Sequence, residues 1–409
     1  GDMDGDGGED IVVSGDWENL DSNAMYLVSG KDLLGASGPI EPLVKASWSD
    51  PTEAWLPDAA VVPAGDLTGD GIDDVWLGTP LELIPGGMTG ALDRSVSVAT
   101  IDVRIEQLAT GSGEDVNHDG VPDLTIHNAA QVALVFHGPL VGKHLDEYTD
   151  AAVRVLIDED VHFTDTVTAQ DADGDGIPEL VVGTNCSAGL GSGGGNPFFG
   201  IIRGSITGDL DASYGERPSS RDNFDAWIDC WGDTRWQWGA RLIGDFTGDG
   251  VGDLVAVDNY KRTYVVPGPF HGAIDVVGTA VLVIEHDQPI GAIPAGVGDL
   301  DGDGLVEIIT FDYGPMPGAE GAEDWRRDGA LYVVRGGRTG VISTAQADTA
   351  FYGQPSDDHN SMRVVAGGDV DGDGLDDVLI GAGNRYVPFE SHAGHVYLLT
   401  GANLLEAAP

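Results

Sequence analysis

Seven copies of one acidic motif, a β-type run after each copy and two further β-type runs in most repeats predict an all-β fold. The expected architecture is a seven-bladed β-propeller with four antiparallel strands per blade. The acidic segment is expected to be the loop between the first and second strands. We expect a single domain over residues 1–409, with the first strand of blade 1 missing upstream of Gly1.

The acidic motif reads D-x-[DNT]-x-D-G-x-x-[DE]. Its seven copies, loops 1 to 7 in chain order, occupy residues 2–10, 66–74, 115–123, 171–179, 245–253, 299–307 and 369–377. A four-stranded propeller blade needs about 40 to 50 residues. The intervals between copies are mostly longer, so they must also hold insertions.

The residue types in the motif indicate a hard cation. Oxygen atoms at positions 1, 3, 5 and 9, with the carbonyl of position 7, can surround Ca²⁺ if the chain turns sharply after position 5. Position 6 is glycine in every copy, as a left-handed turn favours. We therefore expect up to seven Ca²⁺ ions, each bound by one loop.

The predicted metal ligands occupy the same five positions in every loop. Position 1 supplies Asp2, Asp66, Asp115, Asp171, Asp245, Asp299 and Asp369; position 3 supplies Asp4, Thr68, Asn117, Asp173, Thr247, Asp301 and Asp371. Position 5 supplies Asp6, Asp70, Asp119, Asp175, Asp249, Asp303 and Asp373; position 7 supplies the carbonyls of Gly8, Ile72, Val121, Ile177, Val251, Leu305 and Leu375. Position 9 supplies Asp10, Asp74, Asp123, Glu179, Asp253, Glu307 and Asp377. Loops with a neutral residue at position 3 are expected to bind more weakly.

An EF-hand is the alternative calcium loop, and the sequence argues against it. An EF-hand needs an acidic residue at position 12 and a helix on either side. Position 12 here holds Val13, Leu77, Ile126, Val182, Ala256, Thr310 and Ile380. Short runs such as DVWLGT and ELVVGT follow the loops and are typical of buried strands. The loop is therefore predicted to connect two strands.

The segments around each loop complete a four-stranded unit. Short strands such as AVVPAGDL and ARLIGDF precede the loop, and a third strand ends in glycine, as in AMYLVSG and TYVVPGP. A more polar fourth strand follows, as in SVATIDVRI and TAVLVIEH. Four short strands per repeat are typical of propeller blades.

These residues resemble the FG-GAP repeats of integrin α-chain propellers. The resemblance rests on the GD before the loop, the DxDGDGxxD loop, strand ends such as LGTP and IGAG, and the third-strand pattern G-x-V/L-Y-V/L-x-x-G. The FG dipeptide survives only loosely, as in WGARLIGDF, and the third repeat departs from the pattern in ATGSGEDVNHDG. The resemblance implies calcium in the first loop of each blade and ligand binding on the opposite face.

Composition narrows the possible partners and the compartment. The formal net charge of −50 argues against nucleic acid and against anionic lipid surfaces. The sequence has no apolar run near the roughly 20 residues that a membrane helix needs. Cys186 and Cys230 are the only cysteines; we expect them to form a disulfide in a secreted or cell-surface protein, with two free thiols as the alternative.

The predicted partner-binding surface is the face opposite the calcium loops. Insertions on that face span residues 16–23, 48–58, 185–200, 215–239, 312–329 and 383–394. They carry the aromatic and arginine residues that dominate contact surfaces: Trp227, Trp231, Trp236, Trp238, Trp325, Arg326, Arg327, Tyr386 and Phe389. The alternative is that the tryptophans of residues 215–239 form a small core of their own.

These observations predict an extracellular recognition, adhesion or assembly scaffold that binds a protein partner or another copy of itself. A lectin-like propeller that binds glycans is the alternative, and a polysaccharide lyase is the less favoured third class. The sequence has no nucleophile elbow, no HExxH and no phosphate-binding loop. No catalytic residue is therefore predicted.

Overall fold

The computed structural model describes most of the chain. The described residues are 1–15, 24–38, 40–49, 61–78, 80–102, 109–112, 115–128, 132–146, 149–156, 163–184, 198–202, 208–211, 224–229, 239–258, 261–287, 295–312, 330–352, 357–384 and 395–406. Their contacts define two compact units. Unit 1 holds residues 1–171, 175–231 and 271–273, and unit 2 holds residues 172–174, 232–270 and 274–409.

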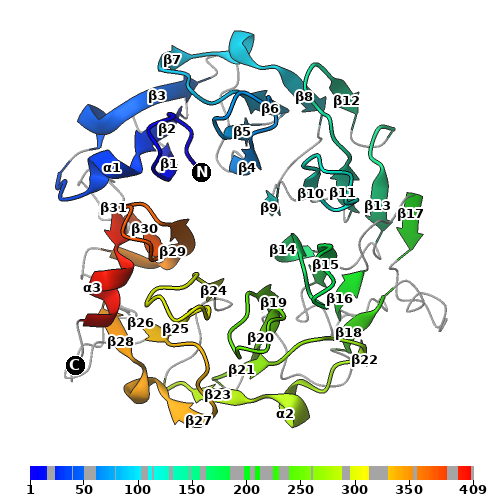
Figure 1. Ribbon diagram of the computed structural model, residues 1–409, viewed down its shortest axis with the longest axis vertical. Coiled ribbons are helices and arrows are strands. Elements are labelled where there is room, and N and C mark those ends of the chain that lie inside the picture. Colours follow the sequence, from blue (N-terminus) through cyan, green and yellow to red (C-terminus); the bar gives the residue numbers. More distant parts are fainter. Residues whose placement is uncertain are drawn as a thin grey trace. The chain divides into compact units, whose positions relative to one another are not determined.

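Unit 1 contains four sheets (Figure 1). The first has the order β1 (Asp10–Gly15), β2 (Ala24–Ser29), β3 (Val44–Ser49), β7 (Gly90–Leu92). The second has β4 (Val61–Gly65), β5 (Asp74–Leu77), β6 (Leu81–Ile84), β8 (Ala99–Asp102), β12 (His144–Asp146). The third has β9 (Ala109–Ser112), β10 (Leu124–Asn128), β11 (Val132–Phe136), β13 (Val153–Leu156), β17 (Gly208–Asp211). The fourth has β14 (Phe163–Gln170), β15 (Glu179–Thr184), β16 (Phe198–Ile202), β18 (Ala226–Asp229), β22 (Gly272–Ala273).

Unit 2 contains the remaining three sheets. The fifth has the order β19 (Ala240–Ile243), β20 (Asp253–Asp258), β21 (Arg262–Val266), β23 (Leu282–Glu285), β27 (Gly340–Ser343). The sixth has β24 (Ala295–Gly296), β25 (Ile308–Asp312), β26 (Ala330–Val334), β28 (Thr349–Tyr352). The described part of the seventh has β29 (Asp357–Gly368), β30 (Asp377–Asn384), β31 (His395–Leu399). The predicted fold class, an all-β seven-bladed propeller with four-stranded blades, is confirmed.

Short helices complete the described secondary structure: α1 (Gly30–Leu33), α2 (Val276–Thr279), α3 (Gly401–Glu406), and the 3₁₀ turns at Glu41–Leu43, Arg94–Val96 and Thr344–Gln346. Within the described residues, no helix has the length and apolar character needed to cross a membrane.

The acidic loops occupy the predicted place in the sheets. Loops 2 to 7 each join the first strand of a sheet to the second, and loop 1 leads directly into β1. The connection from the second to the third strand leaves from the other end of the same sheet because the strands are antiparallel. Each sheet thus has an acidic end and an opposite end.

A parallel fifth strand joins neighbouring blades, and the sequence did not predict it. β7, β12, β17, β22 and β27 each come from the repeat that follows and pair in parallel with the outer strand of the sheet before it. Four of these strands begin at a glycine with φ between +67° and +93°: Gly90, Gly208, Gly272 and Gly340. The pairing covers what would otherwise be an exposed sheet edge.

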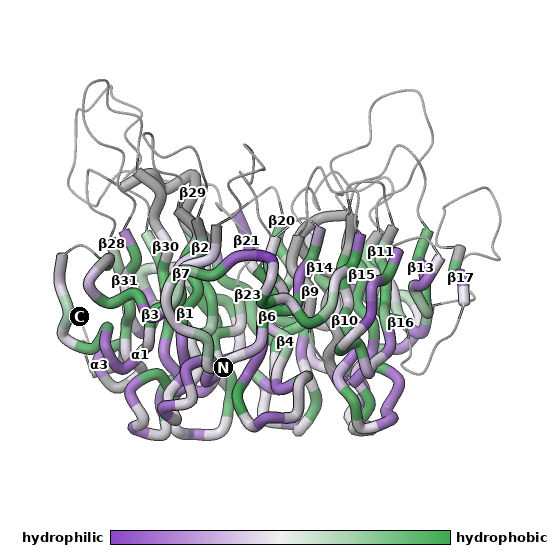
Figure 2. Tube along the Cα trace, turned by 90° about the horizontal axis from the view of Figure 1, so that it is seen from above, coloured by the Kyte–Doolittle hydropathy of each residue, from purple (hydrophilic) through white to green (hydrophobic). Residues whose placement is uncertain are grey.

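The core lies between successive sheets. Val62, Trp76 and Leu83 pack with Ile126 and Phe136 in a buried cluster that joins the second and third sheets. Figure 2 shows apolar residues along the strands and hydrophilic residues gathered in the turns. In unit 2, α3 packs on the sixth sheet: Leu404 is buried, and its carbonyl accepts a hydrogen bond of 2.7 Å from the Thr349 hydroxyl.

Candidate metal centres in seven acidic loops

The first carboxylate of each loop closes a tight turn. Its Oδ2 atom accepts a hydrogen bond from the N–H of the position-6 glycine at 2.7–2.9 Å in all seven copies. These glycines have φ between +81° and +89°. In six of the seven, a Cβ atom added to the glycine would meet no other atom within 4 Å. The positive φ, and not lack of space, therefore requires glycine there.

The carboxylate at position 5 fixes the second half of the turn. It accepts the N–H of position 7 at 2.8–3.0 Å in every loop. Because these bonds are local side chain to backbone contacts, the motif specifies its own conformation. The position-7 carbonyl, a predicted ligand, belongs to the residue held in this way.

The carboxylate at position 9 joins the loop to the third strand of its sheet. Asp253 is fully buried, and its Oδ2 accepts the N–H groups of Phe246 at 2.8 Å and Thr247 at 2.7 Å. Its Oδ1 accepts the N–H of Gly268 at 3.1 Å, just beyond β21. The same third-strand bond is made to Asp74, Asp123, Glu307 and Asp377. In the first sheet, whose described strands start at β1, the equivalent bond to Asp10 comes from Gly30, just beyond β2.

That contact explains the glycine at the end of the third strand. A Cβ atom on Gly86, Gly138, Gly268 or Gly336 would come within 2.4–2.5 Å of the loop it faces. Any larger residue would push the strand away from the position-9 carboxylate. The sequence pattern showed the glycine, and the structure gives the reason for it.

Burial raises the pKa of the position-9 carboxyls. The pKa of Asp10 is raised to about 6 and that of Glu307 to about 7, in both cases chiefly because burial disfavours the charged form. The pKa values of Asp74, Asp123, Asp253 and Asp377 are raised for the same main reason. A bound cation would favour the charged forms again.

In four of the seven loops, three carboxylate groups converge. Each offers an oxygen atom within 4.8 Å of the others: Asp2, Asp4 and Asp6; Asp171, Asp173 and Glu179; Asp299, Asp301 and Asp303; Asp369, Asp371 and Asp377. These are the four loops with an acidic residue at position 3. The other three, with Thr68, Asn117 and Thr247, do not form such a group among the described residues.

A buried carboxylate oxygen in loop 1 is a separate indication that the loop can hold a cation. The Oδ1 atom of Asp2 is buried and has no hydrogen-bond partner among the described residues, while its Oδ2 bonds Gly7. An unpartnered buried carboxylate oxygen is costly unless a cation or donor reaches it. With only oxygen donors present, the residues fit a hard cation such as Ca²⁺.

A second polar cluster lies at the opposite end of two sheets in unit 2. The His286 ring, just after β23, bonds Asp312 Oδ1 through Nδ1 at 2.5 Å and contacts the Thr263 hydroxyl through Nε2 at 3.0 Å. The Thr310 hydroxyl lies 3.3 Å from the same Nε2. All four residues are buried, so the cluster ties the fifth sheet to the sixth.

Sequence reasoning missed this cluster. Thr263 lies on β21, His286 just after β23, and Thr310 and Asp312 on β25. The contacts between these segments span 23 to 47 residues, and no local motif marks them. Tyr264 follows Thr263 on β21; its hydroxyl donates to Asp258 at 2.9 Å, and both Tyr264 and Asp258 are buried. Burial and the Asp258 carboxylate raise the pKa of Tyr264.

Most of the predicted partner-binding residues lie outside the described part of the chain. They are Trp231, Trp236, Trp238, Trp325, Arg326, Arg327, Tyr386 and Phe389, and the same holds for Cys186 and Cys230. Trp227 is described: it lies on β18, is half-buried, and pairs across the sheet with Gly200.

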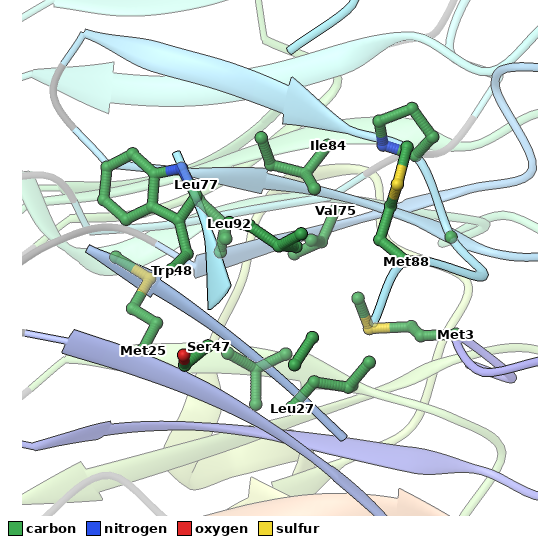
Figure 3. A pocket seen from close by; sticks show the side chains of 14 residues that line it. Met3, Met25, Leu27, Ser47, Trp48, Val75, Leu77, Ile84, Met88 and Leu92 are labelled. Atoms are coloured by element: carbon green, nitrogen blue, oxygen red, sulfur yellow. The ribbon is translucent and has the colours of Figure 1, made fainter. Parts of the chain in front are cut away.

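An apolar pocket lies between the first two sheets of unit 1 (Figure 3). Met25, Trp48 and Leu77 line it, and Met3 of loop 1 and Met88 lie along one side. Among its lining side chains only Ser47 and the Trp48 indole carry polar atoms, and none is titratable. The pocket therefore offers no group for acid–base chemistry.

Comparison with known proteins supports the repeat assignment. Residues 363–399, which hold loop 7, match the FG-GAP repeat family. The resemblance to FG-GAP and integrin α-like propellers that the sequence indicated is therefore confirmed. No curated protein matches the sequence.

Several solved structures are similar at low sequence identity. A crystal structure of BBS1N in complex with ARL6DN has a TM-score of 0.44 at 10% identity, over 86% of this chain and 81% of that one. BamB from Moraxella catarrhalis has a TM-score of 0.36 at 10% identity, over 96% of each chain. The exotype rhamnogalacturonan lyase YesX has a TM-score of 0.30 at 13% identity, over 95% of this chain and 59% of that one. These likenesses are too distant to bear on function.

Proposed function

We propose that this protein is an extracellular or cell-surface recognition scaffold whose blades are stabilised by calcium and whose opposite strand ends bind a protein partner. The observation that carries the calcium part is the convergence of three carboxylates within 4.8 Å in four loops. Like charges held this close are unfavourable without a cation. A bound Ca²⁺ would remove that repulsion and stabilise the folded state.

Calcium removal tests this part of the proposal. At a free calcium concentration of about 100 times Kd, each occupied site adds about 2.7 kcal/mol to the free energy of unfolding. Chelation with EDTA, followed by verified removal of the metal, should therefore lower the melting temperature by many degrees. An unchanged melting curve in the demetallated protein would refute a stabilising role for calcium.

The recognition part rests on the two ends of each sheet. The acidic loops occupy one end, and the long connections that carry the predicted aromatic and arginine residues begin and finish at the other. Loops held by a rigid frame are where binding residues concentrate. Partner binding should therefore be lost in Trp325→Ala or Arg326→Ala, with the calcium-dependent gain in melting temperature kept.

A protein partner, a second copy of this chain and a glycan would all use such a surface. Aromatic residues favour a lectin as the alternative, because sugar rings stack on aromatic side chains. Binding of the wild type on a glycan array, together with loss of that binding in Trp325→Ala, would show that the ligand is a glycan. A concentration-dependent mass in sedimentation would assign self-assembly.

A polysaccharide lyase would need an accessible base and acid. His286 and Tyr264 lie at the end of the sheets opposite the acidic loops, and both are buried. Their hydrogen bonds to Asp312 and Asp258 fix them within the fold. Turnover of uronate polysaccharides, followed at the unsaturated product, would overturn the assignment as a binding protein.

Two further expectations belong to this proposal. The disulfide between Cys186 and Cys230 stays a prediction, and labelling of the unfolded, unreduced protein should find no free thiol. The organisation as one domain over residues 1–409 also stays a prediction. A single cooperative melting transition for both compact units would support it.

A further inference from the structure

In loops 1 and 6, a basic side chain forms an ion pair with a carboxylate of the loop. In loop 1, Lys31 Nζ donates to the Asp6 carbonyl oxygen at 2.6 Å and to Asp6 Oδ1 at 2.9 Å. In loop 6, Arg335 Nη1 lies 3.0 Å from Asp301 Oδ2. Asp6 and Asp301 belong to the converging carboxylate groups, so each cation contacts a predicted calcium ligand.

The fold accounts for the position of both cations. Lys31 follows Gly30, and Arg335 precedes Gly336. The N–H groups of these two glycines bond the position-9 carboxylates of their loops, at 3.3 Å and 3.1 Å. These backbone hydrogen bonds hold the residue before or after each glycine close to the acidic loop, independently of its side chain.

Basic side chains balance part of the negative charge in loop 1, at Asp6 and Asp4. A second lysine, Lys45, lies 4.0 Å from Asp4 Oδ2 while it pairs with Asp32 at 2.7 Å. Two positive side chains thus lie near the three carboxylates of this loop.

Loop 7 is the natural contrast. Thr400 and Ala402 flank the equivalent glycine, Gly401, which bonds Asp377 at 2.9 Å. The described residues place no ion pair on the carboxylates of this loop. Asp369, Asp371 and Asp377 each place a carboxylate oxygen within 4.8 Å of the others, so like charges converge there with no basic side chain from the described residues against them.

We propose that Lys31 and Arg335 are tethered counter-cations that compete with Ca²⁺, so that loop 7 fills at lower calcium than loops 1 and 6. This inference rests on the proposed calcium binding and concerns its regulation. A divalent ion entering loop 1 or loop 6 must displace the basic side chain or remain close to a like charge. A unit charge several ångströms from a divalent ion in a water-like medium changes affinity about tenfold.

Calcium titration of the full chain tests the proposal. Isothermal titration of the wild type should resolve tight and weak classes of site. Lys31→Met and Arg335→Met should each convert one weak site into one about tenfold tighter, and the double variant should convert two. Arg154→Met is the matched control, because Arg154 pairs with Asp209 on outer strands away from the loops and its loss should leave the isotherm unchanged.

A second measurement separates competition from general damage to the fold. Lys31→Met should lower the melting temperature of the demetallated protein, because Asp6 loses its counter-cation, and should increase the gain on adding calcium. A variant that merely weakens the fold would lower the melting temperature in both conditions. Lys31→Gln should repeat the result with a polar side chain.

The titration distinguishes failure of calcium binding from failure of the competition by Lys31 and Arg335. A wild type that binds no calcium would refute the proposed calcium function and this inference with it. A wild type that binds calcium with isotherms that superpose on those of Lys31→Met and Arg335→Met would overturn only the inference.

Discussion

Loop 5 and loop 7 have the same turn but a different set of carboxylates. In both, the position-1 carboxylate holds the position-6 glycine, at 2.8 Å from Asp245 and 2.9 Å from Asp369. In both, a buried position-9 aspartate bonds the N–H groups of positions 2 and 3. Only loop 7 has an acidic third position, Asp371, and only loop 7 brings three carboxylates together.

This comparison separates two roles within one motif. Positions 1, 5, 6 and 9 form the turn and attach it to the sheet, and they do so in both loops. Position 3 adds the charge that a cation would neutralise. A loop of this kind can therefore fold as a structural turn and differ only in its metal affinity.

The largest expected effect comes from removing the residue that the two loops share. Asp253→Ala would leave the N–H groups of Phe246, Thr247 and Gly268 without their acceptor, and that of Phe246 is buried. The expected loss is about 3–5 kcal/mol in the free energy of unfolding. Urea unfolding should show nearly the same loss with calcium and with EDTA, since the carboxylate is used in the turn itself.

A loss seen only with calcium would contradict that division of roles, because it would make position 9 chiefly a metal ligand. Asp249→Asn in the same loop is the control. It keeps the shape of the side chain and its oxygen acceptor, so its effect on the demetallated protein should be small.

The next effect distinguishes the two loops. Asp371→Asn should cost about 2.7 kcal/mol at a calcium concentration near 100 times Kd, because loop 7 would lose its third carboxylate. In EDTA the same variant should be neutral or slightly stabilising, since burial and like charges already raise the pKa of Asp371. Thr247→Val in loop 5 should show no such calcium dependence.

Local features of these loops could be predicted from the sequence, and distant ones could not. The glycine at position 6 and the strands on either side follow from short-range patterns. The partner of Asp253 at Gly268 is 15 residues away, and the contact of Lys31 with Asp6 spans 25. The contact of His286 with Asp312 joins different strands of two sheets. Such contacts depend on how sheets stack, which no local pattern specifies.

The parallel fifth strands illustrate the same limit. β7 has only three residues and an unremarkable sequence, Gly-Ala-Leu. It becomes a strand because the outer edge of β3 lies beside it. Gly90, which begins β7, can be read in the sequence, but its role at the start of a parallel strand depends on the neighbouring sheet.

A pH experiment sharpens the comparison further. In the demetallated protein, the pKa values of Asp10, about 6, and Glu307, about 7, lie above their unfolded values. The folded state therefore binds more protons, and metal-free stability should fall as the pH rises from about 4 through 7. Calcium binding should release protons near pH 6, and the melting-temperature gain on adding calcium should be larger at about pH 7.5 than at about pH 5. An equal gain at both values would contradict the coupling.

The smallest expected effect comes from converting loop 5 into the loop 7 type. Thr247→Asp would restore a third carboxylate beside Asp245 and Asp249 and should create a calcium-dependent gain of about 1 kcal/mol at millimolar calcium. In EDTA it should cost a similar amount, because the Thr247 hydroxyl donates to Asp253 Oδ1 at 3.3 Å and an aspartate would repel that buried carboxylate. Thr247→Asn, which adds the shape without the charge, is the matched control and should show little calcium dependence. If Thr247→Asp and Thr247→Asn respond alike to calcium, the third position does not set the metal affinity, and the difference between the two loops must lie in the residues around them.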